Sequence, residues 1–301
     1  MFALMKKGQH LSLPIDLMLD MFDYTVAPVL LYGCEIWGFQ SLYLIEKLQL
    51  KFYKFLLKLR PSTPSQMIYG ETGKLPITIT IKCRLLLYWQ KLICKDNYNK
   101  LSSIIYDLLF KLYNKGTHMN SYIAFVRNTL IEIGLPGVWD NQKTIKLDRT
   151  WFKNYIKSTL HRQFVQNWQY ILDNNSIYII YRMIKPTLAQ SPYISTLINN
   201  CAIPIVRFIT TNNNLPVNVL RYVDIDRRDR VCTKCNTGDI GDEFHYIFIC
   251  PFFTTKRNEV LPEWYRNRPN ATKFQSLFNT SNKNILLKLK HFICYINTEL
   301  A

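Results

Sequence analysis

Four residues near the C-terminal end have the types and the spacing of a metal site. They follow the pattern Cys-x2-Cys-x9-His-x4-Cys and are Cys232, Cys235, His245 and Cys250. Three thiolates and one imidazole complete a tetrahedral shell, which favours a structural zinc ion. A catalytic zinc would need an open coordination position, and four protein ligands leave none. The sequence therefore predicts structural Zn²⁺ as the cofactor.

Two other interpretations of these cysteines stay open. The thiols could be buried together by chance, with His245 bonded to a backbone carbonyl. Cys232 and Cys235 could instead form a redox pair, although no thioredoxin-like βαβ pattern surrounds them. The other five cysteines lie singly among apolar neighbours, and the N-terminal segment does not resemble a signal peptide, so we expect a reducing compartment.

Turns and aromatic residues must position the predicted ligands. The two-residue gap lets both sulfurs of a tight turn face one ion, and the x4 gap suits a short helical turn. Bends between the two halves are expected at Asn236, Gly238 and Gly241. Because so short a unit cannot build a core alone, we expect neighbouring rings to pack around the ion. These rings are Phe244, Tyr246, Phe248, Phe252 and Phe253.

The chain is strongly basic in both of its halves. Its 301 residues include 38 Lys and Arg against 21 Asp and Glu, which gives a formal net charge of +17. A distributed positive field favours a long anionic partner, most commonly nucleic acid, although basic residues can also serve solubility alone. No apolar run reaches the roughly 18–20 residues that span a bilayer. We expect RNA and DNA as partners, no membrane and no small-molecule substrate.

Basic side chains recur at helical spacing in two segments and also surround the cysteines. Residues 41–60 form the clearest amphipathic helix, with lysines along one edge; a second basic row precedes and enters the segment 150–170. Such rows are either solvated faces or phosphate contacts. The expected apolar face of the first helix consists of Ile45, Leu48, Phe52, Phe55, Leu56 and Leu59. The candidate nucleic-acid-binding residues are Lys47, Lys51, Lys54, Lys58, Lys146, Arg149, Lys153, Lys157, Arg227, Arg228, Arg230, Lys234, Lys256 and Arg257.

Helical periodicity dominates the chain and predicts a mainly α fold. Helices are expected over residues 10–32, 41–60, 78–94, 101–114, 121–133 and 150–170. Two short apolar segments, 177–184 and 203–210, fit a helix or a strand equally well. Asn-rich stretches between them indicate loops.

Three stretches resemble the carboxy-terminal third of reverse transcriptases from LINE-type non-LTR retrotransposons. They are "LPIDLMLDMFDYTVAPVLLYGCEIWG", "IEKLQLKFYKFLLKLRPSTPSQMIYGETGKLPI", and "RRDRVCTKCNTGDIGDEFHYIFICPFF" with the downstream "RPNATKFQSLFN". The resemblance implies a thumb-like helical segment over 1–60, a helical connection region over 61–220 and a zinc-knuckle-like nucleic-acid-binding segment over 221–301. It also implies template RNA and target DNA as partners in target-primed reverse transcription, metal binding by the same four residues, and a location in the cytoplasm and nucleus.

The polymerase carboxylates of that family have no counterpart here. Polymerase chemistry needs acidic residues that hold divalent ions, and the sequence contains no Asp-Asp pair. We therefore assign no catalytic residues and expect a chain that binds nucleic acid and is not an enzyme on its own, with Met1 an internal methionine of a truncated copy or a start chosen by gene prediction. Two alternatives stay open: a zinc-scaffolded protein-interaction module, and part of an active RNA-directed DNA polymerase whose palm is supplied by upstream sequence.

Overall fold

The fold is mainly α-helical, as the sequence predicted. A computed structural model describes residues 13–94, 100–116, 121–142, 144–198 and 200–301. Helices account for 71% of the described residues, which contain no strand beyond one isolated bridge between Val231 and Ile240. The predicted helix over 101–114 is observed with the same bounds, that over 78–94 is shifted by one residue, and that over 121–133 is shorter by one residue at each end.

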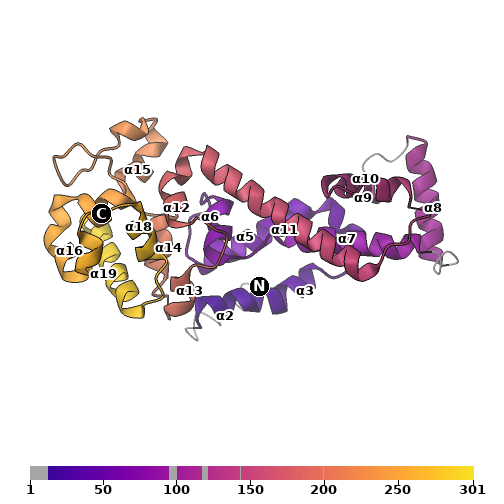
Figure 1. Cartoon of the computed structure of the whole chain (residues 1–301), viewed down its shortest axis with the longest axis horizontal. Coiled ribbons are helices and arrows are strands. Elements are labelled where there is room, and N and C mark those ends of the chain that lie inside the picture. The colour runs from indigo at the N-terminus through magenta and orange to yellow at the C-terminus, as the bar shows by residue number, and fades with distance from the viewer. Residues whose placement is uncertain (1–12, 95–99, 117–120, 143, 199) are drawn as a thin grey trace. The chain divides into compact units, whose positions relative to one another are not determined.

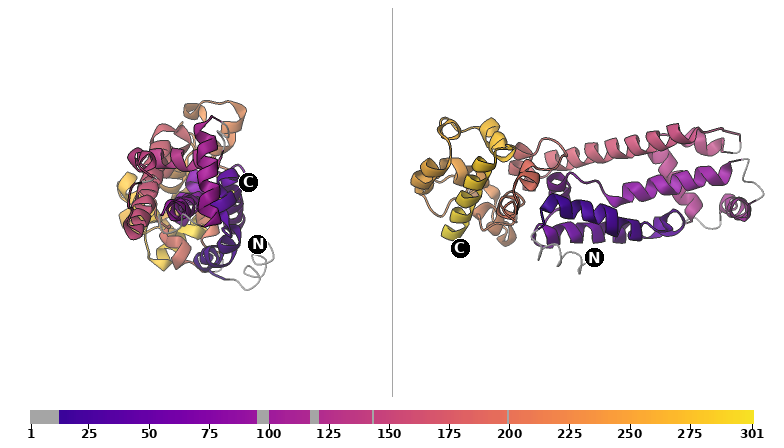
Figure 2. Two further views of the ribbon diagram at one scale, coloured as in Figure 1. Left: turned by 90° about the vertical axis from the view of Figure 1, so that its right-hand side faces the viewer. Right: turned by 90° about the horizontal axis from the view of Figure 1, so that it is seen from below.

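The chain packs into two compact units, each built from segments that are far apart in the sequence (Figure 1). Unit 1 comprises the described residues up to Asp23, Leu50–Lys74 and Trp168–Ala301, and unit 2 comprises Tyr24–Gln49 and Leu75–Asn167. Two long helices, α5 (Leu42–Leu56) and α11 (Arg149–Asn174), contribute residues to both units, and Figure 2 shows α11 as one continuous helix. The expected division into 1–60, 61–220 and 221–301 concerns functional parts and stays a prediction.

Unit 2 buries an aromatic core between its helices. Trp89 stacks against Trp139 with ring centroids 6.4 Å apart, and Phe152 of α11 closes the same cluster. Its elements beside α5 and α11 are α3 (Ala27–Leu30), α4 (Cys34–Trp37), η2 (Gly38–Gln40), α7 (Ile77–Ile93), α8 (Leu101–Asn114), α9 (Tyr122–Glu132) and α10 (Pro136–Asp140).

Unit 1 consists mostly of short helices, and prolines begin several of them. Pro192 and Pro216 are the first residues of two helices, and Pro204 lies in the first turn of a third. Proline suits these positions because its missing N–H has no intrahelical partner there anyway. The elements are α2 (Ile15–Met21), α6 (Ser65–Thr72), η4 (Ser176–Tyr178), α12 (Ile179–Ile184), α13 (Pro192–Thr196), α14 (Ile203–Ile209), α15 (Pro216–Val219), η5 (Leu220–Val223), η6 (Arg227–Asp229), η7 (His245–Ile249), η8 (Pro251–Phe253), α16 (Thr254–Val260), α17 (Glu263–Arg266), α18 (Ala271–Phe278) and α19 (Lys283–Glu299).

The structure settles the two segments whose type the sequence left open. Both are helices: 177–184 becomes the end of η4 followed by α12, and 203–210 becomes α14. The predicted helix over 10–32 is interrupted, because α2 passes into a π-helical turn, η1 (Phe22–Val26), before α3; its residues 10–12 lie outside the described part.

The lysine-bearing helix α5 differs from the prediction in length and in its buried face. It ends at Leu56, and Lys58 has a positive φ of 52°. Leu48 and Phe55 are exposed, whereas Gln49, Tyr53 and Leu57 are buried. The expected apolar face was therefore wrong at two positions. Gln49 enters the core because its amide oxygen accepts from the Ile77 backbone N–H at 2.9 Å and its amide nitrogen donates to the Leu75 carbonyl at 3.0 Å.

A buried polar network holds α6 against α12 and α13. The carboxylate of Glu71 accepts hydrogen bonds from the hydroxyls of Tyr181, at 3.0 Å, and Tyr193. The Lys185 ammonium lies nearby and donates to Ser191 Oγ at 2.7 Å. Burial raises the pKa of both tyrosines and lowers the pKa of Lys185. The tyrosines therefore stay protonated hydrogen-bond donors to the Glu71 carboxylate.

Close packing of α6 against these groups gives a stability prediction at Gly70. A Cβ at this position would lie 2.2 Å from the Tyr181 hydroxyl and 3.1 Å from the Trp168 ring. We expect Gly70→Ala to lower the free energy of unfolding by about 1–3 kcal/mol, because the Tyr181 ring must move away from Glu71 to make room for the new methyl group. Gly137→Ala is the matched control: nothing lies within 4 Å of the new Cβ, and the position is helical. Urea unfolding curves that move equally for both variants would contradict this packing.

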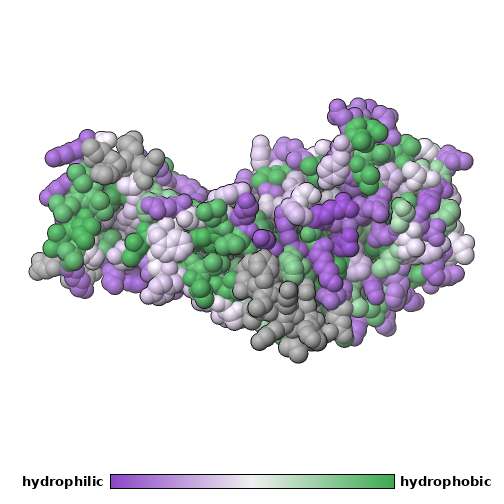
Figure 3. Space-filling model, turned by 180° about the vertical axis from the view of Figure 1, so that it is seen from behind, coloured by the Kyte–Doolittle hydropathy of each residue, from purple (hydrophilic) through white to green (hydrophobic). Residues whose placement is uncertain are grey.

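One helix of unit 2 presents apolar side chains to solvent. The exposed apolar residues of α8 are Leu101, Ile104, Ile105, Leu108 and Leu112, and Figure 3 shows a hydrophobic patch over this helix at the left edge of the view. No single helix in the described ranges combines the length and the apolar character needed to cross a membrane. Two successive helical segments, Ile15–Leu30 and Cys34–Gln40, meet that test only when counted together, and the chain bends by 66° between them.

Candidate metal centre

The first two predicted ligands lie on a short hairpin. Val231 and Ile240 form an antiparallel bridge, the Cys232 N–H donates to the Asp239 carbonyl at 2.9 Å, and the Gly241 N–H donates to the Arg230 carbonyl at 2.8 Å. The loop inside this bridge reverses through Gly238, whose φ is +74°, a conformation that glycine adopts without strain. Cys232 and Cys235 are thereby carried on one tight turn, as the spacing predicted.

The other two ligands lie at the ends of the π-helical turn η7. The Cys250 N–H donates to the His245 carbonyl at 2.8 Å, so the turn brings these two residues together. Asp242 precedes the turn, and its Oδ1 accepts from the His245 N–H at 3.0 Å. The expectation of a helical turn between His245 and Cys250 is confirmed.

The four ligand atoms converge on one point. All of them lie within 4.8 Å of one another, with 3.8 Å between the sulfurs of Cys232 and Cys250 and 3.4 Å between Cys235 Sγ and His245 Nε2. Cys232, His245 and Cys250 are buried, and Cys235 is half-buried. The structure therefore brings together every predicted ligand in an arrangement that could hold a metal ion.

A second layer of groups orients the ligands. Cys232 Sγ accepts from the Lys234 N–H at 3.4 Å and lies 3.3 Å from the Tyr246 hydroxyl, while Cys235 Sγ lies 3.2 Å from Thr237 Oγ1. His245 Nδ1 is buried without a hydrogen-bond partner among the described residues, and Asp239 Oδ2 approaches it to 3.6 Å. A carboxylate behind the imidazole of a ligand is the usual way in which proteins fix its orientation.

The protonation of the cysteines differs across the cluster. Burial raises the pKa of Cys250 to about 12. Desolvation acts in the same direction at Cys235, but hydrogen bonds from Thr237 outweigh it and lower the pKa of that thiol. Burial also lowers the pKa of His245, which keeps the imidazole neutral and able to coordinate. A bound cation would therefore displace a proton from Cys250.

Arg257 supports the metal centre from inside the fold. Its side chain is only 6% exposed, and its guanidinium donates to the carbonyls of Ile247 and Cys250, each at 2.8 Å. These two acceptors belong to or directly follow η7. The prediction that Arg257 contacts nucleic acid is wrong, because its donors face the backbone of the metal centre.

Two of the three arginines before the hairpin also have structural partners. Arg227 pairs with Asp242 at 3.0 Å, and Arg230 donates to the carbonyls of Ile225 and Val217 at 2.9 and 3.1 Å. Arg228 is exposed. On the other flank, Lys234 lies over the Phe252 ring at 5.6 Å, and Lys256 pairs with Glu259 at 2.7 Å.

The basic rows lie on the exposed faces of α5 and α11 with three exceptions: Lys54 is half-buried, Lys58 follows the end of α5, and Lys146 precedes α11. Lys47, Lys51 and Lys58 are exposed, but Lys54 is half-buried and donates to the Pro61 carbonyl. In the second row Arg149, Lys153 and Lys157 are exposed on α11, whereas Lys146 precedes the helix. The helix begins after Asp148, whose carboxylate accepts from the Trp151 N–H at 2.7 Å and acts as its cap.

The rings around the metal centre pack partly as expected. Tyr246, Phe248 and Phe253 are buried, but Phe252 is exposed. Sequence reasoning missed the main support, which is α18: Phe274 contacts Phe244 and Phe248 with ring centroids 5.3 and 5.7 Å apart. The apolar spacing of "ATKFQSLF" was the available signal for that helix.

A buried carboxylate beside the ligands was not predicted as a site residue. Glu243 is 3% exposed, and its Oε1 accepts from the amides of Asn218 at 2.8 Å and Asn213 at 3.3 Å. Burial and the neighbouring Asp242 raise the pKa of Glu243 to about 7. Both asparagines are buried, and Asn213 lies in a stretch that the sequence identified only as a loop.

Comparisons of the chain with protein-family models, with curated proteins and with solved structures find no match. The resemblance to LINE-type reverse transcriptases therefore rests on the three sequence stretches, and it stays a prediction.

Proposed function

We propose that the four clustered side chains bind a structural zinc ion. Two sulfurs held at the usual zinc distance of about 2.3 Å and a tetrahedral angle are about 3.8 Å apart, and the corresponding sulfur–nitrogen separation is about 3.5 Å. The observed values of 3.8 Å and 3.4 Å agree with both. The ion would supply no chemistry at an open position, because the chain already provides four ligands; it would fix the hairpin to η7.

We further propose that this chain binds nucleic acid as part of a retroelement reverse transcriptase. The observation that carries the proposal is the four-ligand cluster between a hairpin and η7 within a chain of net charge +17. Zinc knuckles of this kind hold basic and aromatic side chains against single-stranded RNA or DNA. The proposal assigns binding to the chain, and template RNA and target DNA are the expected partners.

The exposed basic face of α11 supports the same function. Arg149, Lys153 and Lys157 lie within two turns, and Trp151 on the same helix is 49% exposed and stacks on Tyr155 with centroids 5.2 Å apart. The cationic face can meet the phosphates of a strand, and the aromatic pair on another side of the same helix offers a ring on which a base can stack.

Salt dependence tests the proposal. We expect the affinity for a single-stranded oligonucleotide to fall by roughly 100-fold between about 50 and 200 mM salt, because bound cations are released from the strand. The double variant Lys153→Gln/Lys157→Gln should reduce the slope of log K against log salt by about 2. Fluorescence anisotropy at several salt concentrations measures both.

The control for this experiment removes the same charge elsewhere. Lys283→Gln/Lys288→Gln changes two exposed lysines of α19 that are not among the candidate residues. This variant should show the same slope of log K against log salt as the parent chain. Equal slopes for both double variants would remove α11 from the interface. An absence of binding at micromolar protein would favour the protein-interaction module, and template-dependent synthesis in a primer-extension assay with Mg²⁺ would show that the chain is an enzyme.

A further inference from the structure

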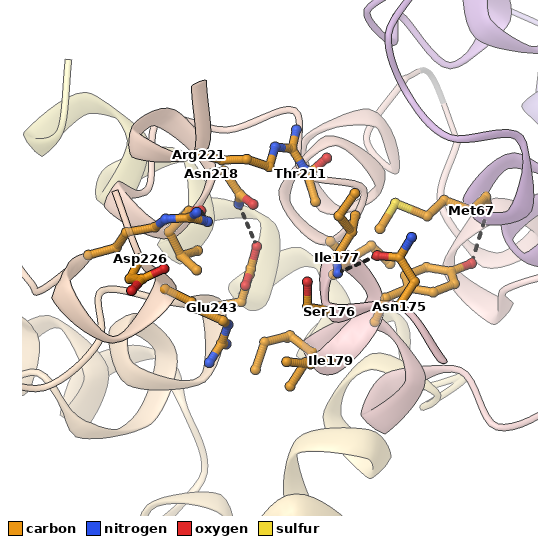
Figure 4. A pocket seen from close by; sticks show the side chains of 16 residues that line it. Met67, Asn175, Ser176, Ile177, Ile179, Thr211, Asn218, Arg221, Asp226 and Glu243 are labelled. Atoms are coloured by element: carbon orange, nitrogen blue, oxygen red, sulfur yellow. Dashed lines mark hydrogen bonds between the residues drawn. The ribbon is translucent and has the colours of Figure 1, made fainter. Parts of the chain in front are cut away.

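A cavity of about 390 Å³ lies in unit 1 and is partly lined by Arg230 and Glu243, which flank the metal-binding hairpin in the sequence. Its volume falls within the roughly 300–1,000 Å³ of ligand pockets. Figure 4 shows Glu243 and Asp226 on one side of the cavity, Ser176 and Ile179 on the other, and Arg221 above them. The residues that line this cavity include none of the four proposed metal ligands and none of the candidate basic residues of α5 and α11.

The cavity combines apolar walls with a few polar groups. Ile177, Ile179, Ile209 and Val217 line it together with Tyr181. Branched aliphatic side chains of this kind suit the faces of a flat ring, and a small number of polar groups then fix the orientation of that ring. The polar groups are therefore the source of any selectivity.

Two carboxylates provide the acceptors. Glu243 is 3% exposed, and the amides of Asn213 and Asn218 donate to its Oε1, which fixes the side chain. Asp226 is a second acceptor on the same side. In its ionised form Glu243 accepts N–H donors and repels acceptors, so a ligand with a donor edge suits it.

Three guanidinium groups provide the donors. Arg221, Arg227 and Arg230 all line the cavity. The structure gives Arg227 a bond through Nη2 to Asp242 and gives Arg221 a bond through Nη2 to Tyr222. Because a guanidinium carries five N–H donors, both retain others for an acceptor atom or a phosphate.

We propose that this cavity binds the guanine nucleotide unit, with Glu243 accepting from the N1–H and N2–H edge of the base. Guanine alone among the bases has two adjacent donors on its Watson–Crick edge, and its O6 acceptor suits a guanidinium. Arg221 and its neighbours would hold the attached phosphate. If the proposed nucleic-acid binding is correct, the unit is an unpaired guanine of the bound strand; the same chemistry would also accept a free guanine nucleotide.

Single-atom changes in the base test this assignment. Three probes are single strands that are identical except for the unpaired base at their end, which is guanine, hypoxanthine or adenine. The fourth probe is free GMP. We expect the guanine strand to bind the parent chain about tenfold more tightly than the hypoxanthine strand, which lacks the N2 amino group, and than the adenine strand. Glu243→Gln should remove this preference, so that the guanine, hypoxanthine and adenine strands bind with similar affinities. Glu259→Gln makes the same change on the exposed face of α16 and should keep the preference.

A second variant protects the test against a folding defect. Ser176→Phe places a ring in the cavity from an exposed residue outside the hydrogen bonds that fix Glu243, and it should abolish the guanine preference without lowering the melting temperature. Strands that bind with equal affinities would overturn the inference and leave the proposed function intact. Binding of GMP combined with no binding of any strand would support the cavity assignment and contradict nucleic-acid binding; no binding of GMP or of any strand would overturn both.

Discussion

Removal of one thiolate from the metal centre should unfold the region around it. We expect Cys250→Ser to lose the bound zinc and to lower the free energy of unfolding by at least about 3 kcal/mol, because metal binding is folding free energy in such units and reaches about 10–16 kcal/mol in isolated zinc fingers. Cys250 is fully buried between η7 and η8, so the change also places a serine hydroxyl in the core without a hydrogen-bond partner. Native mass spectrometry and thermal unfolding with and without a chelator measure the two effects.

The control for this prediction is a cysteine outside the cluster. Cys294→Ser changes a half-buried free thiol of α19 in the same way and should keep one equivalent of zinc and the parent chelator response. Cobalt substitution adds a direct readout, because three thiolates and one imidazole give a tetrahedral spectrum that Cys250→Ser alters. Equal zinc content in the parent chain and in Cys250→Ser would show that these residues do not form the site.

Local patterns in the sequence predicted the parts of the molecule that depend on neighbouring residues. The ligand set is one of them, because Cys232 with Cys235 and His245 with Cys250 are each held by a single turn. The helix over 101–114 is another, because its 3.6-residue periodicity is uninterrupted. In both cases the chain segment that carries the pattern also determines the geometry.

Contacts between distant segments could not be predicted in this way. Glu71 accepts from Tyr193, which is 122 residues away, and periodicity contains no record of such a pair. The buried face of α5 is a similar case: Gln49 is buried because the backbone at Leu75 and Ile77 offers it partners. From the sequence alone, a polar residue such as Gln49 is predicted to lie at the surface. Its burial is possible because its amide group forms hydrogen bonds within the core.

The formal charge of +17 overstates the positive surface near the metal centre. Arg257 is buried, Arg230 donates to backbone carbonyls, and Arg227 pairs with Asp242. These arginines hold the hairpin, η7 and their surroundings in place. The candidate residues that remain exposed include Arg228 and, on α11, Arg149, Lys153 and Lys157.

Replacement of Arg257 should separate its structural role from its charge. We expect Arg257→Lys and Arg257→Met each to lower the free energy of unfolding by roughly 2–4 kcal/mol, because the carbonyls of Ile247 and Cys250 lose their charged donor. Lysine keeps the charge, but its compact ammonium cannot reproduce the planar fork that reaches both acceptors. Burial lowers the pKa even of Arg257, and a lysine ammonium in the same place would be disfavoured more strongly in its charged form.

Arg266→Lys is the matched control for this change. Arg266 also forks between two acceptors, Leu261 O at 3.0 Å and Asn258 Oδ1 at 2.8 Å, but it is half-buried and distant in sequence from η7. We expect it to lose less than about 1 kcal/mol and to release zinc to a chelator at the parent rate. Arg257→Lys should release zinc faster, because η7 carries both His245 and, at its end, Cys250. An unchanged release rate in Arg257→Lys would mean that the guanidinium only fills space behind the metal centre, and a weaker affinity for nucleic acid at unchanged stability would restore Arg257 to the interface.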